Sequence, residues 1–230
     1  MNSESIYTEL IPWGYYLIRG MVQGVPEFSG CQGQCKDNAV LPDYDAMPGV
    51  NRTFQPEAFA EKWNVSGEVA LKIFERNSDL SERKRLTFFN SRYTDISDVR
   101  KLKKDFFHGR SDVSVFGIGF VNPELTKTPE FRKLPPFAPG GEFLGFDLYG
   151  FYCYENKPDF SKLDCSMGCP FRHCDMENRV PAELNIPLNA HGLYSDAESA
   201  ERVASHVYEH KLGEPEFYVP FGIIRYGEGK

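Results

Sequence analysis

The chain has 230 residues, of which 41% are hydrophobic, 14% aromatic and 26% charged, and its formal net charge is −7. This length and composition suit one large hydrophobic core or two small ones and exclude a wholly disordered chain. The longest apolar runs, such as residues 113–121, fall far short of the roughly 20 residues of a membrane helix. The start of the chain is polar and acidic, unlike a secretory signal, so we expect a cytoplasmic protein that makes no membrane contact.

Apolar runs predict four strands in the N-terminal part of the chain, at residues 15–25, 68–75, 86–89 and 113–121. The second run alternates, so Val69, Leu71 and Ile73 would share one face of a half-buried strand. The fourth run is almost continuously apolar, which is typical of a central strand covered on both faces. In this run Gly117 and Gly119 indicate close packing against the strand, because a dinucleotide-binding turn needs a third glycine and a helix start.

Two helices are predicted in the same part of the chain. One covers residues 54–63, and the other runs from a cap at Asp95 or Ser97 to about residue 108. Residues 26–49, before the first helix, form a polar loop rich in Gly, Pro and Asp. A loop of this length is unusual in a compact domain, which favours a mobile or functional segment.

The C-terminal part begins after residues 122–141, which contain five prolines and predict a linker or a long wrapping loop. Residues 142–154 then predict a strand or hairpin, and residues 217–226 a closing strand that bends or ends its pairing at Pro220. A helix is predicted to start near Ser195, because Ser195 to Glu198 has the pattern of a capping box. The apolar stripe of this helix consists of Ala200, Val203, Ala204 and Val207.

Together these elements predict an α+β fold, with a mostly antiparallel, aromatic-rich sheet and about three packed helices. Residues 1–121 would form a neutral α+β part and residues 142–230 an acidic one, joined by residues 122–141. A single domain containing both parts is the alternative.

The excess of negative charge lies in one part of the sequence. Residues 141–230 contain 15 acidic and 8 basic side chains, whereas residues 1–140 contain 18 of each. Such a segment attracts basic partners and repels nucleic acid, so we expect a basic protein partner and no nucleic acid. The basic clusters at residues 83–85 and 100–104 are more typical of solvated helix faces. The residues predicted to bind the partner are the aromatic Tyr149, Tyr152, Tyr154 and Tyr194 and the acidic Asp196, Glu198 and Glu201.

The cysteines provide the alternative, a zinc-binding enzyme or zinc-stabilised module. Its candidate ligands lie in two predicted loops and are Cys31, Cys35, Cys165, Cys169, His173 and Cys174. Thiolates and imidazole suit tetrahedral zinc. In both cysteine pairs, however, three residues separate the cysteines, where zinc knuckles have two. Ordinary loop thiols are therefore the simpler interpretation, no cofactor is required, and Cys153 reads as a core thiol within its strand.

His206 and His210 have the spacing at which two helical imidazoles share a metal, but the metalloprotease pattern needs Glu directly after the first His. Histidines facing solvent near a helix end are the commoner case. No nucleophile–base pair, phosphate loop or nucleophile elbow can be identified, so the sequence favours binding over catalysis.

One resemblance concerns residues 142–226. The segment opens with Glu142-Phe143-Leu144-Gly145-Phe146-Asp147, continues with Leu188-Asn189-Ala190-His191-Gly192-Leu193-Tyr194 and ends with Val219-Pro220 and Ile223-Ile224. This order resembles small bacterial proteins of the immunity type, which neutralise a cognate toxin in polymorphic-toxin or contact-dependent systems. The resemblance implies a protein that binds and blocks its partner and has no catalytic residues. The loop at residues 165–178 departs from that pattern.

Overall fold

A computed structural model describes residues 10–19, 39–41, 54–87, 92–127, 134–153, 163–170, 179–212 and 217–227. Within these residues eight strands form one sheet in the order β3-β4-β1-β5-β8-β6-β7, with β2 also paired to β1, and each pair is antiparallel. The strands are β1 (Ile11–Arg19), β2 (Ala39–Leu41), β3 (Leu86–Thr87), β4 (Arg92–Tyr93), β5 (Val113–Phe120), β6 (Gly141–Cys153), β7 (Leu163–Pro170) and β8 (Phe217–Tyr226). The predicted α+β fold with an antiparallel sheet is confirmed.

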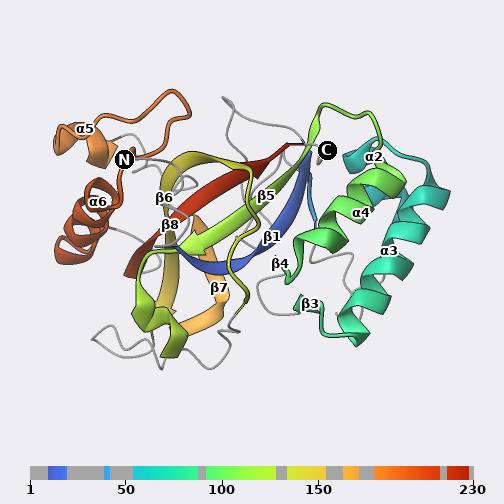
Figure 1. The fold of residues 1–230 in the computed structure, drawn as a ribbon. Coiled ribbons are helices and arrows are strands. Elements are labelled where there is room, and N and C mark those ends of the chain that lie inside the picture. Colours follow the sequence, from blue (N-terminus) through green and yellow to red (C-terminus); the bar gives the residue numbers. More distant parts are fainter. Residues whose placement is uncertain are drawn as a thin grey trace.

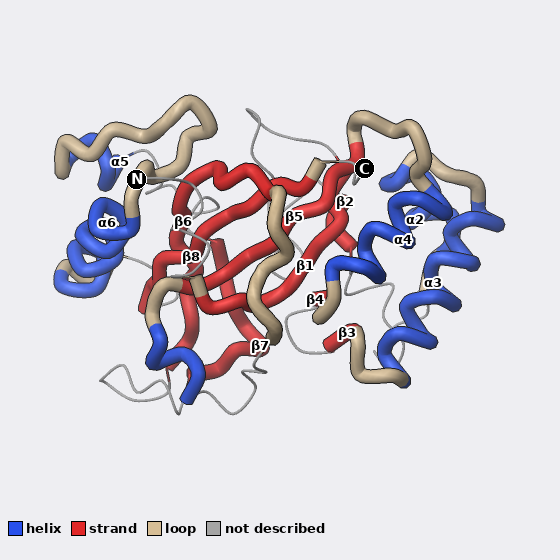
Figure 2. The backbone as a smooth tube through the Cα atoms, in the orientation of Figure 1, coloured by secondary structure: helices blue, strands red, loops and turns tan. Residues whose placement is uncertain are grey.

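The helices gather at the two ends of this sheet (Figures 1 and 2). In the described part of the chain they are α2 (Pro56–Trp63), α3 (Gly67–Glu82), α4 (Ile96–Phe106), α5 (Arg179–Glu183) and α6 (Ala197–Glu209), with a 3-10 turn, η2, at Pro123–Lys127. Helices α2, α3 and α4 lie at one end, and α5 and α6 at the other. All five contribute buried side chains to one core, which also includes Leu17, Val115, Leu148 and Ile224 from the sheet.

Several predicted elements are confirmed with small shifts of their ends. Helices α2 and α4 match the two predicted helices, and the Asp95 carboxylate caps α4 by accepting a 2.8 Å hydrogen bond from the Ser97 amide. Strands β5, β6 and β8 match three predicted strands. The predicted end of pairing at Pro220 holds on one side of β8 only: the β5 ladder stops at Phe221, whereas the β6 ladder continues to Phe217.

The strand predicted at residues 68–75 is wrong, because these residues belong to helix α3. The Ser66 hydroxyl caps this helix by accepting a 3.2 Å hydrogen bond from the Val69 amide. The buried residues Ala70, Ile73, Asn77 and Leu80 follow a helical period, and Leu71 is 47% exposed. The short alternation from Val69 to Ile73 is compatible with either period, and the cap and the longer helical repeat decide the outcome.

The sheet has two apolar faces, and the second lies opposite the face that packs against the helices. Its buried residues include Trp13, Tyr16, Phe116, Phe120, Phe151, Val219 and Phe221. Phe120 of β5 and Phe151 of β6 lean toward each other across β8, and their ring centroids are 5.7 Å apart. At one edge the Arg92 guanidinium, which is 1% exposed, lies 3.7 Å from the centroid of Trp13. Burial in this environment raises the pKa of Tyr16 to about 12, so its hydroxyl stays protonated at neutral pH.

The segment at residues 134–140 crosses the helix-bearing face of the sheet (Figure 2). Phe137 of this segment lies flat on β5, over Gly117 and Gly119. A Cβ atom at Gly119 would lie 2.7 Å from Phe137 Cε2, closer than real Cβ contacts. Tyr15, which pairs with Gly117 across β1 and β5, meets the ring edge to face with a centroid distance of 5.9 Å. The two glycines therefore provide the space for Phe137, in agreement with the predicted close packing.

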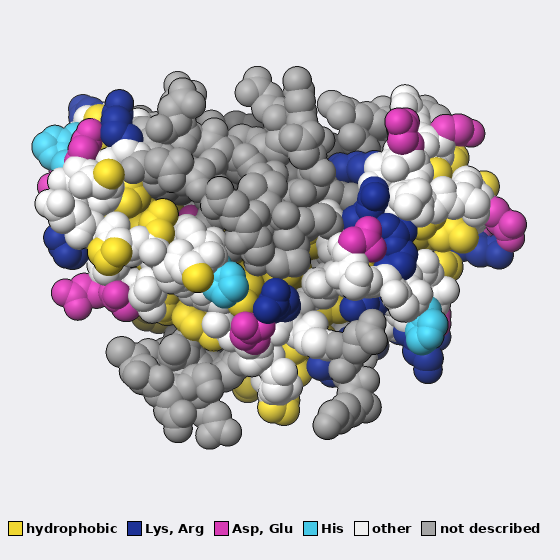
Figure 3. Space-filling model, turned by 90° about the horizontal axis from the view of Figure 1, so that it is seen from above, with side chains coloured by type: hydrophobic (Ala, Val, Ile, Leu, Met, Phe, Trp, Pro, Cys, Tyr) yellow, Lys and Arg dark blue, Asp and Glu magenta, His cyan; other side chains and the backbone are white. Residues whose placement is uncertain are grey.

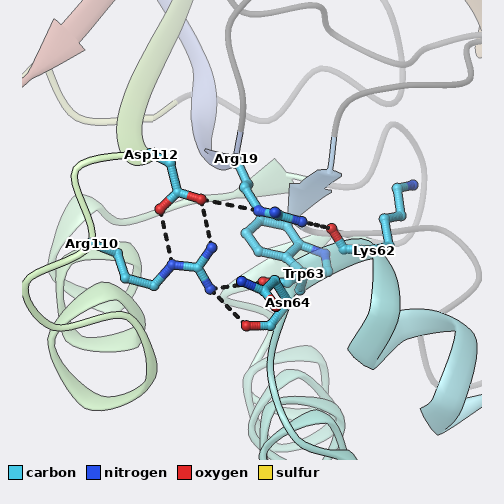
Figure 4. A network of polar contacts seen from close by, with 6 residues as sticks. All are labelled: Arg19, Lys62, Trp63, Asn64, Arg110 and Asp112. Carbon is cyan, nitrogen blue, oxygen red and sulfur yellow. Dashed lines mark hydrogen bonds and ion pairs between the residues drawn. The ribbon is translucent and has the colours of Figure 1, made fainter.

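A polar network fixes the end of α2 to the sheet (Figure 4). Arg110 donates to both carboxylate oxygens of Asp112, at 2.9 and 2.5 Å, and to the carbonyl oxygens of Trp63 and Asn64, at 2.8 and 2.9 Å. Arg19 of β1 donates to Asp112 at 3.0 Å and to the Lys62 carbonyl. The two arginines thus satisfy carbonyls that the helix end leaves without internal partners. Hydrogen bonds from Arg110 and then Arg19 outweigh burial and lower the pKa of Asp112 to about 2.

We predict that Gly119→Ala lowers the free energy of unfolding by about 2 kcal/mol, because the new methyl group overlaps Phe137. Gly67→Ala is the control: nothing lies within 4 Å of its Cβ position, so stability should stay unchanged or rise by up to about 1 kcal/mol. Urea denaturation measures both. In a Phe137→Ala background the cost of Gly119→Ala should fall, and an equal cost in both backgrounds would contradict the contact.

We predict that Asp112→Asn destabilises the protein by about 1 kcal/mol at pH 7, a value discounted because the Asp112 side chain is 44% exposed. The pKa of this carboxylate is depressed on folding, so its stabilisation is fully present above its unfolded pKa. It is lost as the pH falls from about 4 towards 2. Denaturation curves of the two proteins should therefore converge in that window, and a difference that persists at pH 2 would refute the assignment.

Candidate docking face on helix α6

The turn at residues 188–194 precedes α6 and is bonded to β6. The Asn189 carboxamide oxygen accepts hydrogen bonds from the amides of His191 and Leu193, at 2.8 and 3.1 Å, and its nitrogen donates to the Leu144 carbonyl at 2.8 Å. The turn lies against Gly145, whose φ is +141° and whose Cβ position is only 2.7 Å from Leu193 Cβ. Two of the sequence blocks that carry the immunity-type resemblance therefore contact each other, and only glycine fits at this point of β6.

Helix α6 is capped by Asp196 rather than by the predicted Ser195. The Asp196 carboxylate accepts a 2.7 Å hydrogen bond from the Ser199 amide and a 3.1 Å bond from its hydroxyl. The helix accordingly starts at Ala197, one residue later than a cap at Ser195 would place it. The predicted apolar stripe is confirmed, since Ala200, Val203, Ala204 and Val207 are all buried.

The opposite face of α6 is open to solvent. Its exposed residues are Glu198, Glu201, Arg202, Ser205, Tyr208, Glu209, His210 and Lys211; we call them the α6 face. Tyr208 is 40% exposed and meets Phe217 of β8 edge to face, with ring centroids 6.3 Å apart. Glu201 and Ser205 lie along the same side of the helix as Tyr208, at spacings of seven and three residues. The face therefore presents one large ring among charged side chains.

Tyr208 replaces the aromatic anchors predicted from the sequence. Tyr194 is 3% exposed, and its backbone exchanges hydrogen bonds of 2.8 and 2.9 Å with Phe146, so its placement in a docking face is wrong. Tyr149 is half-buried against Phe120, with ring centroids 6.3 Å apart. The side chain of Tyr152 and the whole of Tyr154 lie outside the described residues.

The acidic candidates Asp196, Glu198 and Glu201 are all exposed on or beside α6. Tyr208 was missed because it directly follows Val207, a residue of the buried stripe. A helical projection of residues 197–209 separates the two, since they lie about 100° apart.

Charges of both signs occur at each end of the molecule (Figure 3). Residues 179–212, which contain α5 and α6, have five acidic and three basic side chains. Residues 54–87 and 92–112, which contain α2, α3 and α4, have ten acidic and twelve basic ones. The α5–α6 end is thus the more negative, although seven of the 15 acidic residues of segment 141–230 lie outside the described residues.

The predicted zinc ligands are only partly described. Cys165 and Cys169 lie in β7 rather than in a loop: Cys169 pairs with Gly150, and Cys165 falls in a bulge between the paired residues Asp164 and Gly168. Cys31, Cys35, His173 and Cys174 lie outside the described residues, as does the side chain of Cys153. Among the described residues no group of three or more His, Cys, Asp or Glu side chains is arranged to hold a metal. Zinc binding stays a prediction.

His206 and His210 face each other near the end of α6, with ring centroids 4.2 Å apart. His210 belongs to the α6 face, and His206 is half-buried beside it. None of the described helices has the length and apolar character needed to cross a membrane.

Comparisons with protein-family models, with curated proteins and with solved structures gave no match to this chain. The immunity-type resemblance of residues 142–226 therefore enters the functional argument as a proposal.

We predict that Asp196→Ala lowers the free energy of unfolding by about 1 kcal/mol, because it removes the N-cap of α6. Ser195→Ala, one residue earlier and also exposed, should leave stability unchanged. Thermal unfolding followed by circular dichroism measures both variants. A larger loss of stability in Ser195→Ala than in Asp196→Ala would contradict this assignment and indicate that Ser195 is the N-cap.

Proposed function

We propose that this is a non-catalytic, cytoplasmic interaction protein of the immunity type, which blocks a basic partner protein by binding it through the α6 face. The observation that carries the proposal is the exposed ring of Tyr208 on a helix face that also exposes Glu201 and Glu209. Tyrosine is among the residues that most often dominate binding energy at protein interfaces. Carboxylates around it would steer a basic partner toward the helix and exclude acidic ones.

The contacts that hold α6 in place also favour the proposal. The apolar stripe on its inner side, the Asp196 cap and the turn at residues 188–194 hold the helix on β6 and β8. A face built on such a fixed helix loses little conformational entropy on binding, which favours affinity. The sequence blocks of the immunity-type resemblance coincide with these supporting contacts at Gly145 and Asn189.

We predict that Tyr208→Ala combined with Glu201→Lys weakens binding to the basic protein by at least roughly tenfold. The partner would be a basic toxin domain co-produced with this chain, and isothermal titration calorimetry would give Kd. Raising the ionic strength from about 0.05 to 0.3 M should weaken binding by wild type more than by the variant, because screening removes the attraction of Glu201.

The control is Glu61→Lys, which makes the same charge change at an exposed site of α2, at the other end of the molecule. It should leave Kd within about twofold of wild type after correction for net charge. Equal losses in the α6 variant and in this control would reject the α6 face. A Kd of the α6 variant equal to that of wild type would also reject it.

A further inference from the structure

Helix α3 bears the most exposed large hydrophobic side chain of the described residues. Leu71 is 47% exposed, whereas Ala70, Ile73 and Leu80 of the same helix are fully or almost fully buried. Glu68 and Glu75 lie one turn before and one turn after Leu71 on its outer side. The helix therefore turns an apolar side chain to solvent between two carboxylates.

Two aromatic rings extend this apolar surface. Phe74 stacks on Phe54, with centroids 4.4 Å apart and ring planes 13° from parallel, and both side chains are half-buried. Phe54 also contacts Phe59 of α2 at a centroid distance of 5.7 Å. We call Phe54, Leu71 and Phe74 the α3 strip. Hydrophobic side chains are visible at the end of the molecule where α2, α3 and α4 lie (Figure 3).

The charges along α3 are mainly negative. The helix carries four acidic residues, Glu68, Glu75, Asp79 and Glu82, and two basic ones. Lys72 pairs with Glu68 at 2.6 Å and Arg83 with Asp79 at 2.7 Å, but these pairs join neighbouring turns and both partners in each are more than a third exposed. Pairs of this kind contribute little to stability, so the cations of a partner can compete for these carboxylates.

The helix beneath the strip is held in place. On its inner side Asn77 accepts a 2.8 Å hydrogen bond from the Tyr93 hydroxyl, and both residues are completely buried. The polar network at the end of α2 fixes the neighbouring helix to the sheet. The strip therefore cannot turn inward to hide Leu71 without breaking buried contacts.

We propose that the α3 strip is a second docking site, for a basic amphipathic helix of another protein. The apolar side of that helix would cover Leu71 and Phe74, and its Lys or Arg side chains would meet Glu68, Glu75 and Glu82. This is the arrangement in which an amphipathic helix lies on an apolar surface with complementary charges at its borders. An anionic lipid surface does not fit, because these carboxylates would face charges of the same sign.

The site differs from the α6 face in position. The two helices lie at opposite ends of the sheet (Figure 1), so one chain could hold both partners at once. The inference does not depend on the immunity-type function, since the strip consists only of residues of α3 and of Phe54, which precedes α2.

The test uses a fluorescein-labelled peptide of Leu and Lys in a helical pattern, about 18 residues long so that it can fold on binding. Fluorescence anisotropy gives Kd, and amide chemical shifts of the ¹⁵N-labelled protein map the site. We expect the shift changes to centre on Leu71, Phe74 and Glu75. Leu71→Ser should weaken binding roughly tenfold, and Glu75→Gln by a few-fold.

Ala182→Ser is the control, because it makes an apolar-to-serine change at an exposed site of α5, outside both the α3 strip and the α6 face. It should leave Kd for the peptide unchanged, and circular dichroism should show both serine variants folded, since neither side chain is in a core. The inference is overturned if wild type does not bind the peptide, if the two serine variants weaken binding equally, or if the shifts centre on α6. Stronger binding to phosphatidylserine vesicles than to the peptide would also overturn it.

Discussion

The pairing of β8 with β5 on one side and β6 on the other is the interaction on which the rest of the fold depends. Strand β8 comes last along the described chain, yet it lies inside the sheet. Val219, Phe221 and Ile223 contribute to the core on one face, and Tyr218, Ile224 and Tyr226 to the core on the other. Neither core is complete before this strand is inserted. The contacts are far apart in sequence, so loop closure opposes them until apolar burial compensates.

Glycines placed opposite large side chains let the parts of the molecule approach closely. Gly119 makes room for Phe137, Gly145 for the turn that contains Leu193, and Gly14 for the Arg92 side chain. In each case the glycine lies in a strand, where a side chain would normally add stability. The loss is offset by the neighbour that fills the space. The second of these positions also brings the turn that precedes α6 into contact with β6.

The sequence predicted the parts of this structure that local patterns determine. Long apolar runs gave β5 and β8, and the cap with its apolar stripe gave α6 to within a residue or two. Residues 68–75 were misassigned because a five-residue alternation fits a strand and a helix equally well, and the Ser66 cap was overlooked. Strand order and register were beyond prediction, since they follow from contacts between distant segments.

The candidate sites likewise include residues that local sequence patterns identify and residues that they do not. Glu198 and Glu201 were identified because the sequence shows the cap of the helix and the charged residues outside its apolar stripe. Both are exposed. Tyr194 was misjudged because the local sequence does not show whether a tyrosine beside a turn is buried or exposed. Its burial follows from the β-bridge between Tyr194 and Phe146, which are distant in sequence. Leu71 was assigned to the buried face of a strand, and the correct helical period reverses that assignment.

Strand β7 forms the outer edge of the sheet among the described strands, pairing with β6 alone. Between the pairs Phe151–Gly168 and Tyr152–Asp164 its ladder is interrupted by three residues, and its last residue is Pro170, which has no amide hydrogen. A regular edge would offer an uninterrupted row of amides and carbonyls to another copy. This irregular edge offers only short stretches, so edge-to-edge pairing of sheets from different copies is discouraged even when the protein is concentrated.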